Sequence, residues 1–162
     1  MKRAENLWQS FRYAFRGLGY AISSQRNMRI HLAAASLMLG LGWLLRLPAS
    51  EFLAVLLAIT VVLVAEMVNT AVETVVDLAS PEYHRLAEVA KDVAAGAVLI
   101  AALGAAAVGA DVFLPRVGEL PMAIVLQLSR HPWPLVGLLV GWGIVGGLLV
   151  WAGPRGLDRE GG

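Results

Sequence analysis

Residues 52–77 read FLAVLLAITVVLVAEMVNTAVETVVD, an apolar helical pattern that becomes acidic toward its end. Residues 54–65 carry no charged side chain and are typical of a membrane-spanning helix. The same pattern then continues through a polar group: Glu66, Asn69, Thr70, Glu73 and Asp77. At about 100° per residue, all members of this group lie within roughly 60° of Glu66 around the helix axis. The stretch therefore predicts one helix with a polar stripe.

The depth of this stripe in a bilayer follows from helix geometry. A rise of about 1.5 Å per residue and a hydrocarbon core of roughly 30 Å place Glu66 about 20 Å from an entry point near Phe52. Glu73 then lies near the far boundary and Asp77 in water. A charge at mid-bilayer costs on the order of 2.5–3.5 kcal/mol, so a carboxylate kept there indicates function. Two structural alternatives remain open: the acids pair with basic residues of neighbouring helices, or the helix leaves the bilayer at Glu66.

The composition supports a small integral membrane protein. Of 162 residues, 58% are hydrophobic and 15% are charged, unlike an ordinary soluble domain. A net charge of +1 and the lack of a basic run argue against a nucleic-acid partner. The absence of cysteine excludes disulfides and thiolate metal sites. The predicted fold class is an all-α integral membrane protein.

Residues 1–29 are predicted to form an amphipathic helix in the membrane surface, followed by a bend. Large apolar side chains recur at helical spacing over residues 7–22, while Arg12 and Arg16 lie elsewhere on the helical wheel. Packing of this helix on the bundle is the alternative. Residues 23–27 are polar enough to bend at the interface.

Residues 30–110 are predicted to form a core with three membrane spans. The first span, residues 30–45, ends at a tight turn in which Pro48 breaks the helix and Ser50 caps the next one. The acidic helix is the second span. The third helix is predicted to begin with Ser80 as its cap and Pro81 at its first position.

Residues 111–162 are predicted to form a linker, an additional transmembrane helix and a polar tail. Residues 134–151 are apolar and of roughly bilayer length, with Trp133 and Trp151 as interface anchors. Within the linker, residues 122–128 are compatible with a short surface helix.

Charge predicts the orientation of the chain. With the N-terminus in the cytoplasm, ten basic residues lie on that side and three lie outside, as the positive-inside rule requires. The acidic stripe, Lys91 and Asp92 then face the cytosol, where nucleotide is available.

Signatures of soluble nucleotide-binding proteins are missing. Lys2 and Lys91 do not follow glycine-rich loops, so the chain has no Walker A motif. The glycine pattern of residues 141–146 lies inside an apolar span and is interpreted as helix packing. The histidines are too scattered for a zinc site and are expected at the surface or at an interface: His31, His84 and His131.

What remains is a group of carboxylates, an amide and a lysine at the cytoplasmic membrane face. Oxygen ligands at this density suit Mg²⁺, which binds one or two carboxylates plus substrate phosphates. A lysine can neutralise phosphate charge, and a carboxylate can take a proton from an attacking hydroxyl. Because only Glu66 is deep enough to meet a group anchored in lipid, the predicted reaction is phosphoryl transfer from ATP to a lipid alcohol.

Residues 66–101, EMVNTAVETVVDLASPEYHRLAEVAKDVAAGAVLIA, resemble the signature of the prokaryotic diacylglycerol kinase and undecaprenol kinase family. The resemblance extends back through QRNMRIH, residues 25–31, and covers about residues 11–109. It implies a homotrimer of three-span subunits in the bacterial plasma membrane, with composite active sites facing the cytoplasm. The segments SPEYH and AKDVAAGAVL resemble the undecaprenol kinase branch more closely than the diacylglycerol kinase branch. Undecaprenol is therefore the expected acceptor and diacylglycerol the alternative.

The resemblance also implies a role for each polar residue. Glu66 would be the general base, Asn69 would support it, and Glu73 would hold Mg²⁺ against the ATP phosphates. The implied nucleotide contacts are Tyr13, Asp77, Lys91 and Asp92. Gln25 stands where many members have a second metal-binding glutamate; its amide oxygen can coordinate a cation but brings no charge, which leaves the number of bound ions open.

Two readings from other classes remain open. A small transporter or channel could relay protons or cations along the stripe, which explains Glu66 but not the Lys91 and Asp92 pair. A structural scaffold would use a ridge of small residues on the third helix for close helix packing: Ala97, Ala101, Ala105 and Gly109.

Overall fold

The computed structural model describes residues 7–130, together with 137, 140–143 and 147. These residues are helical apart from short connections, and no strand occurs among them. The elements are α1 (Leu7–Ser24), α2 (Arg26–Leu44), α3 (Ala49–Ala79), α4 (Arg85–Phe113), the 3-10 helix η1 (Leu114–Glu119) and α5 (Leu120–Arg130). The all-α prediction is confirmed for the part of the chain described. The additional span predicted at residues 134–151 lies largely outside it.

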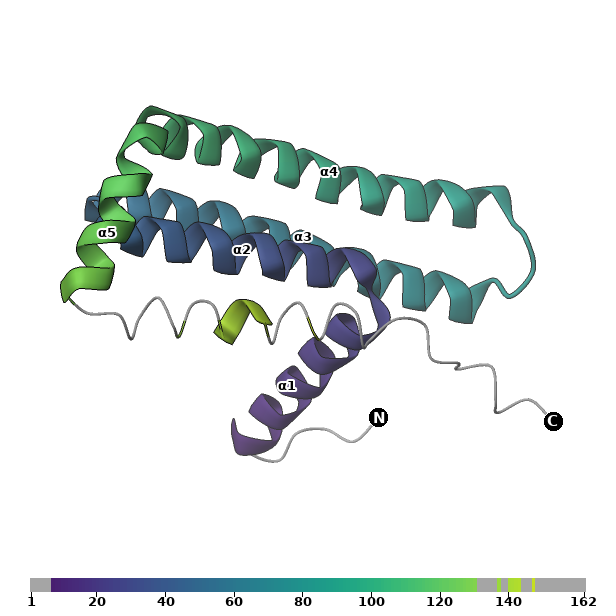
Figure 1. Ribbon diagram of the computed structural model, residues 1–162. Helices are drawn as coiled ribbons and strands as arrows, with labels where there is room; N and C mark the ends of the chain where they lie inside the picture. The colour runs from purple at the N-terminus through teal and green to yellow at the C-terminus, as the bar shows by residue number, and fades with distance from the viewer. Residues whose placement is uncertain (1–6, 131–136, 138–139, 144–146, 148–162) are drawn as a thin grey trace.

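Three long helices, α2, α3 and α4, run side by side, while α1 leaves the bundle at a steep angle and α5 crosses its opposite end (Figure 1). The most extensive packing is between α3 and α4, followed by that between α2 and α3. Two helical stretches in the described region are long and apolar enough to cross a membrane: Ala49–Ala79 and Arg85–Ser129. The 31 residues of α3 span about 46 Å, which exceeds a hydrocarbon core of roughly 30 Å, so its acidic end extends beyond the apolar layer.

A single residue joins α1 to α2. The five-residue bend expected from the sequence is reduced to Gln25, which has an extended backbone with φ −101° and ψ 119°. Helix α1 continues through Ser24 because the Ser23 and Ser24 hydroxyls donate to the Tyr20 carbonyl, at 3.0 and 2.8 Å. The buried guanidinium of Arg29 then donates to the backbone carbonyls of Ile22 and Ser23, at 3.2 and 3.1 Å, and so satisfies the end of α1.

The α2–α3 hairpin closes through a Schellman motif. Arg46 adopts the left-handed conformation with φ 53°, its N–H donates to the Trp43 carbonyl, and the Leu47 N–H donates to the Gly42 carbonyl. Gly42 is buried where a Cβ atom would lie 3.1 Å from Leu47 Cδ1, so the absence of a side chain lets the hairpin close. The prediction that Ser50 caps α3 is wrong, because the helix begins at Ala49 and its cap position is Pro48, without a side-chain bond.

The α3–α4 connection also differs from the prediction. Ser80 ends α3 instead of starting α4, because its N–H donates to the Val76 carbonyl. Helix α4 begins later, at Arg85, and the His84 side chain accepts a hydrogen bond of 3.2 Å from the Leu86 N–H. The imidazole therefore takes the capping role that the sequence pattern assigned to the serine hydroxyl.

The opposite end of the bundle is joined by an ion pair. The Arg116 guanidinium in η1 donates a hydrogen bond of 2.9 Å to Oε1 of Glu51 at the start of α3, and the same nitrogen forms an ion pair with Oε2 at 2.8 Å. This pair connects the chain after α4 to the first turn of α3. The helix predicted at residues 122–128 is confirmed as α5, with the wider bounds Leu120–Arg130.

Candidate active site

The polar side chains of α3 become more exposed toward the end of the helix. Glu66, Asn69 and Thr70 are buried, with 1%, 5% and 4% of their surface exposed. Glu73 is half-buried and Asp77 is exposed. The helix therefore carries its polar groups from the interior of the bundle to the solvent within about three turns.

A hydrogen-bonded bridge connects α3 with the junction of α1 and α2. The Gln25 amide donates to one Glu73 oxygen at 2.8 Å, and the Asn69 amide donates to the other at 3.0 Å. Gln25 reaches Glu73 because it is the one extended residue between two helices that both pack near α3. The Glu73 carboxylate is thus fixed by an amide on each oxygen, and Gln25 and Glu73, which the resemblance assigns to metal binding, lie together.

Three buried oxygen atoms beside this bridge have no hydrogen-bond partner: both carboxylate oxygens of Glu66, and Oδ1 of Asn69. The Thr70 hydroxyl does not satisfy them, because it donates to the backbone carbonyl of Glu66 at 2.9 Å. Buried polar atoms are nearly always hydrogen-bonded, so an unpartnered set requires an explanation. These acceptors are suited to a hydroxyl group or to a cation.

Farther out, α3 and α4 are linked by an ion pair between Asp77 and Lys91. The side chains remain accessible, with 66% of Asp77 and 38% of Lys91 exposed. Asp92, the next residue of α4, is also exposed. The structure thus brings the charged residues predicted for nucleotide binding to the same end of the α3–α4 pair (Figure 1).

Tyr13 lies on α1 and is half-buried. The guanidinium carbons of Arg12 and Arg16 each lie 5.8 Å from the centre of its ring, within the range of a cation–π contact. Helix α1 packs against both α2 and α3. Tyr13 is therefore on the helix that leads into Gln25, but its predicted contact with nucleotide is not tested by this geometry.

The side chains around Glu73 can supply only part of the coordination shell of Mg²⁺. Within the described residues, no group of three or more histidine or acidic side chains is arranged to hold a metal ion. Glu73 supplies one carboxylate, and the unpartnered Asn69 Oδ1 and Glu66 oxygens are hard ligands close by. This set matches the way proteins hold Mg²⁺ with few carboxylates and with substrate phosphates completing the shell.

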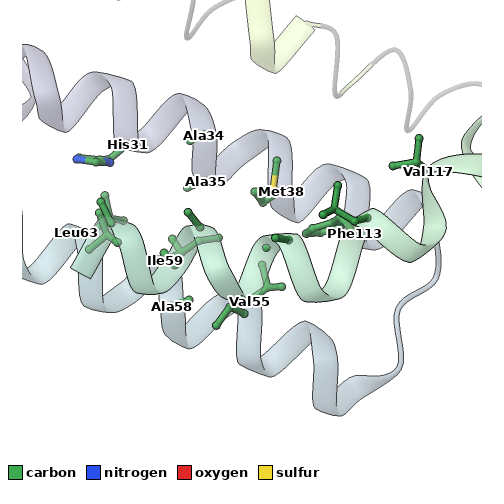
Figure 2. Close-up of a pocket in the computed structure, with 18 residues that line it drawn as sticks. His31, Ala34, Ala35, Met38, Val55, Ala58, Ile59, Leu63, Phe113 and Val117 are labelled. Carbon is green, nitrogen blue, oxygen red and sulfur yellow. The ribbon is translucent and has the colours of Figure 1, made fainter. Parts of the chain in front are cut away.

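An apolar cavity of about 460 Å³ lies between α2, α3 and α4 (Figure 2). Val62 and Leu63 of α3 line it and lie one turn before Glu66. Apart from His31, every described residue that lines the cavity is apolar. Figure 2 shows His31 at one end and Phe113 and Val117 toward the other.

Sequence reasoning placed the acids correctly on one helix but missed two residues near them. Arg29 is buried and holds the α1–α2 junction. His31, expected at a surface or interface, is half-buried against the cavity and lies within electrostatic range of Glu66. Both are polar residues in the first turns of an otherwise apolar helix, and this unusual position is the signal that could have identified them.

Comparison with known proteins identifies the family. The chain matches the prokaryotic diacylglycerol kinase family over residues 12–113. A diacylglycerol kinase of Synechocystis is 46% identical over 113 residues, which cover 69% of this chain and 65% of that protein. An undecaprenol kinase of Bacillus subtilis is 38% identical over 109 residues, which cover 67% of this chain and 89% of that protein. A diacylglycerol kinase of Escherichia coli K12 is 33% identical over 89 residues, covering 55% of this chain and 73% of that protein. No solved structure matches the chain.

The matched region contains α2, α3 and α4 and most of α1, and so includes every candidate site residue. The predicted resemblance, over about residues 11–109, is confirmed in both family and extent. The chain belongs to the prokaryotic diacylglycerol kinase family of lipid kinases.

Proposed function

We propose that this protein transfers the γ-phosphoryl group of ATP to a lipid alcohol, with undecaprenol as the acceptor and Mg²⁺ as the metal. The observation that carries the proposal is the environment of Glu66. This carboxylate is almost fully buried, both its oxygens lack partners, and it lies one turn beyond an apolar cavity. Some relatives are named diacylglycerol kinase and another is named undecaprenol kinase, so the choice of acceptor needs a direct test.

Glu66 acts as the general base in this proposal. One of its free oxygens accepts the proton of the lipid hydroxyl while the hydroxyl oxygen forms a bond to the γ-phosphorus. The bond between that phosphorus and the β–γ bridging oxygen breaks, ADP leaves, and the proton stays on Glu66 until solvent removes it. The apolar walls beside Glu66 suit a hydrocarbon chain and limit competition from water.

Glu73 is the residue proposed to hold Mg²⁺, with Gln25 as a neutral second ligand. Bound Mg²⁺ would neutralise charge on the ATP phosphates. In the present arrangement Gln25 directs its amide N–H to Glu73, so its oxygen would become a ligand only after the side chain turns. Asn69 orients Glu73 by its own amide bond and leaves Oδ1 free toward the site.

The nucleotide is proposed to bind at the exposed end of the α3–α4 pair. Lys91 is the cation available to the phosphates, and Asp77 and Asp92 accompany it at the same end. Tyr13 is the proposed contact from α1. Because the ATP site must be reached from solvent and the hydroxyl from lipid, the proposal places this end at the cytoplasmic face of the bacterial plasma membrane.

The proposed membrane arrangement adds α2 to the two helical stretches that are long and apolar enough to span a membrane. We propose that α2 crosses the bilayer together with α3 and α4, although the polar first turns of α2 leave it a shorter apolar part. Helix α1 exposes large apolar side chains, including Trp8 with 79% and Phe15 with 70% of their surface exposed, which favours a position in the membrane surface. Three subunits are proposed to assemble into a homotrimer with composite sites.

A lipid-substrate panel tests the function directly. Purified protein in lipid bicelles receives radiolabelled ATP, Mg²⁺ and either undecaprenol, diacylglycerol or no acceptor. Phosphate transfer to undecaprenol is expected, and Glu66→Gln and Glu73→Gln should each lower turnover by on the order of 100-fold or more. Thr60→Val is the matched control, because Thr60 is exposed on α3 and its hydroxyl bonds only to the Leu56 carbonyl of its own helix.

Each result of the panel has a defined meaning. Transfer to diacylglycerol alone would replace the acceptor but keep the reaction. Full turnover in both glutamine variants would reject the roles of Glu66 and Glu73. Ion flux into liposomes without nucleotide, in the absence of any lipid phosphorylation, would instead favour the transporter reading.

A further inference from the structure

The position of His31 suggests a role that the proposed chemistry does not yet use. Its imidazole lies at one end of the apolar cavity, across from Leu63, as Figure 2 shows. Leu63 is three residues before Glu66, so the two α3 side chains lie on the same face of the helix. His31 and the Glu66 carboxylate are also within electrostatic range of each other.

Most other donors around Glu66 are already used, the buried Arg29 Nε being the exception. The Asn69 amide donates to Glu73, and the Thr70 hydroxyl donates to a backbone carbonyl. Arg29 directs one guanidinium nitrogen to the carbonyls that end α1. Among these neighbours, His31 is the one whose side chain faces the cavity.

A carboxylate that serves as a base needs a fixed orientation. The last torsion of a glutamate side chain has a broad distribution, so hydrogen bonds are needed to fix the direction of a carboxylate such as Glu66, whose two oxygens have no partner. Reacting groups must be held close to the productive geometry by hydrogen bonds from neighbouring residues. A neutral imidazole carries one N–H that can donate such a bond.

We propose that His31 is a positioning residue for Glu66. Both carboxylate oxygens are free in this structure, and in the reacting complex the imidazole N–H donates to one of them and leaves the other to the acceptor hydroxyl. This inference rests on the proposed function, because it assigns a partner to the base of that reaction. It accounts for both free oxygens of Glu66, one held by the protein and one by the substrate. It also explains why one polar side chain stands in an otherwise apolar lining.

The test compares His31→Leu, which removes the donor, with His31→Gln, which keeps one. His31→Phe is a second variant that keeps a ring of similar size. Leu and Phe should lower kcat by about 10- to 100-fold with an unchanged KM for ATP, while Gln should recover most of the lost rate. Ser36→Ala is the control on the same helix, because the Ser36 hydroxyl bonds to the Ala33 carbonyl and does not line the cavity.

A double variant separates positioning from a general structural effect. If His31 acts through Glu66, then adding His31→Leu to Glu66→Gln should cause no further loss of kcat. A multiplicative loss in the double variant, or full kcat in His31→Leu and His31→Phe, would overturn the inference while a wild-type protein that phosphorylates lipid keeps the proposed function. A wild-type protein inactive on every lipid alcohol would reject the proposed function itself.

Discussion

In the part of the chain that the structure describes, two ion pairs join α3 to the residues that follow it, one at each end of the bundle, and they differ in accessibility. Arg116 donates a hydrogen bond to one oxygen of Glu51 and forms an ion pair with the other, and only 24% and 33% of these side chains are exposed. Lys91 binds Asp77 through one oxygen, and 38% and 66% of these are exposed. A half-buried pair with a hydrogen bond is suited to holding helices together, whereas an exposed pair contributes little to stability and remains available to a ligand.

The neighbourhoods of the two pairs differ in the same way. The residues of α3 that follow Glu51 are apolar, and Glu51 itself contacts η1 through Arg116. Toward Asp77 the same helix carries the bridge from Gln25 to Glu73 and the free oxygens of Glu66. One end of α3 therefore holds the fold, and the other end presents unsatisfied polar groups.

Among the changes that compare the two ends of α3, the largest expected effect comes from removing the cation of the exposed pair. Lys91→Met should raise the KM for ATP by about 10-fold, because the phosphates lose a charge partner, while stability changes by less than about 0.5 kcal/mol. Kinetics at varied ATP and a thermal midpoint in detergent measure both. An unchanged KM for ATP together with a clear loss of stability would reverse the assignment of this end.

The matched change at the other end is Arg116→Met. It leaves Glu51 partly buried without its partner and should destabilise the fold by about 1 kcal/mol, discounted for the partial exposure of the pair. The activity of the folded fraction should stay close to that of the wild type. A KM change like that of Lys91→Met would show that the two ends are not separate.

A smaller effect is expected from Gln25→Glu. The substitution replaces an amide donor by a second carboxylate beside Glu73, so the hydrogen bond of 2.8 Å becomes a repulsion. The thermal midpoint without metal should fall, by less than in Arg116→Met, and added Mg²⁺ should raise it more than in the wild type. Equal responses of both proteins to Mg²⁺ would argue against a metal at this bridge.

The smallest effect concerns Tyr83, in the connection between α3 and α4. Its hydroxyl donates to Glu88 at 2.7 Å, and this bond, with a minor contribution from burial, raises the pKa of the Tyr83 phenol above 10.0. The bond is therefore complete below the unfolded pKa and is lost as the pH rises through the raised value. An ultraviolet titration should show Tyr83 ionising at lower pH in Glu88→Gln, with the thermal midpoint at neutral pH unchanged in Tyr83→Phe.

Much of the fold was predictable because helical periodicity is a local property. The apolar run and the acidic stripe follow from spacing within a single helix, and the short helix predicted at residues 122–128 lies within α5. The starts of helices were less predictable: Ser50 and Ser80 carry the right chemistry for caps, but Pro48 and His84 occupy those positions. Cap choice depends on which backbone groups the neighbouring element has already satisfied, and this is not visible in the sequence.

The residues of the candidate site could be chosen from the sequence, and their roles stay predictions, but their contacts could not be foreseen. The stripe on α3 placed Glu66, Asn69 and Glu73 together, because they are near neighbours on one helix. The bond from Gln25 to Glu73 joins residues 48 positions apart and depends on how α1 turns into α2. His31 was missed for the same reason, since its relation to Glu66 exists only after two helices pack.

The one-residue link at Gln25 has a mechanical consequence. A single residue spans at most about 3.6 Å, so α1 cannot pivot far about its end without withdrawing the amide from Glu73. The tilt of α1 is therefore coupled to the hydrogen bond that Gln25 donates to Glu73. A surface that fixes the angle of α1 would also fix the orientation of the Glu73 carboxylate, which is proposed to bind the metal.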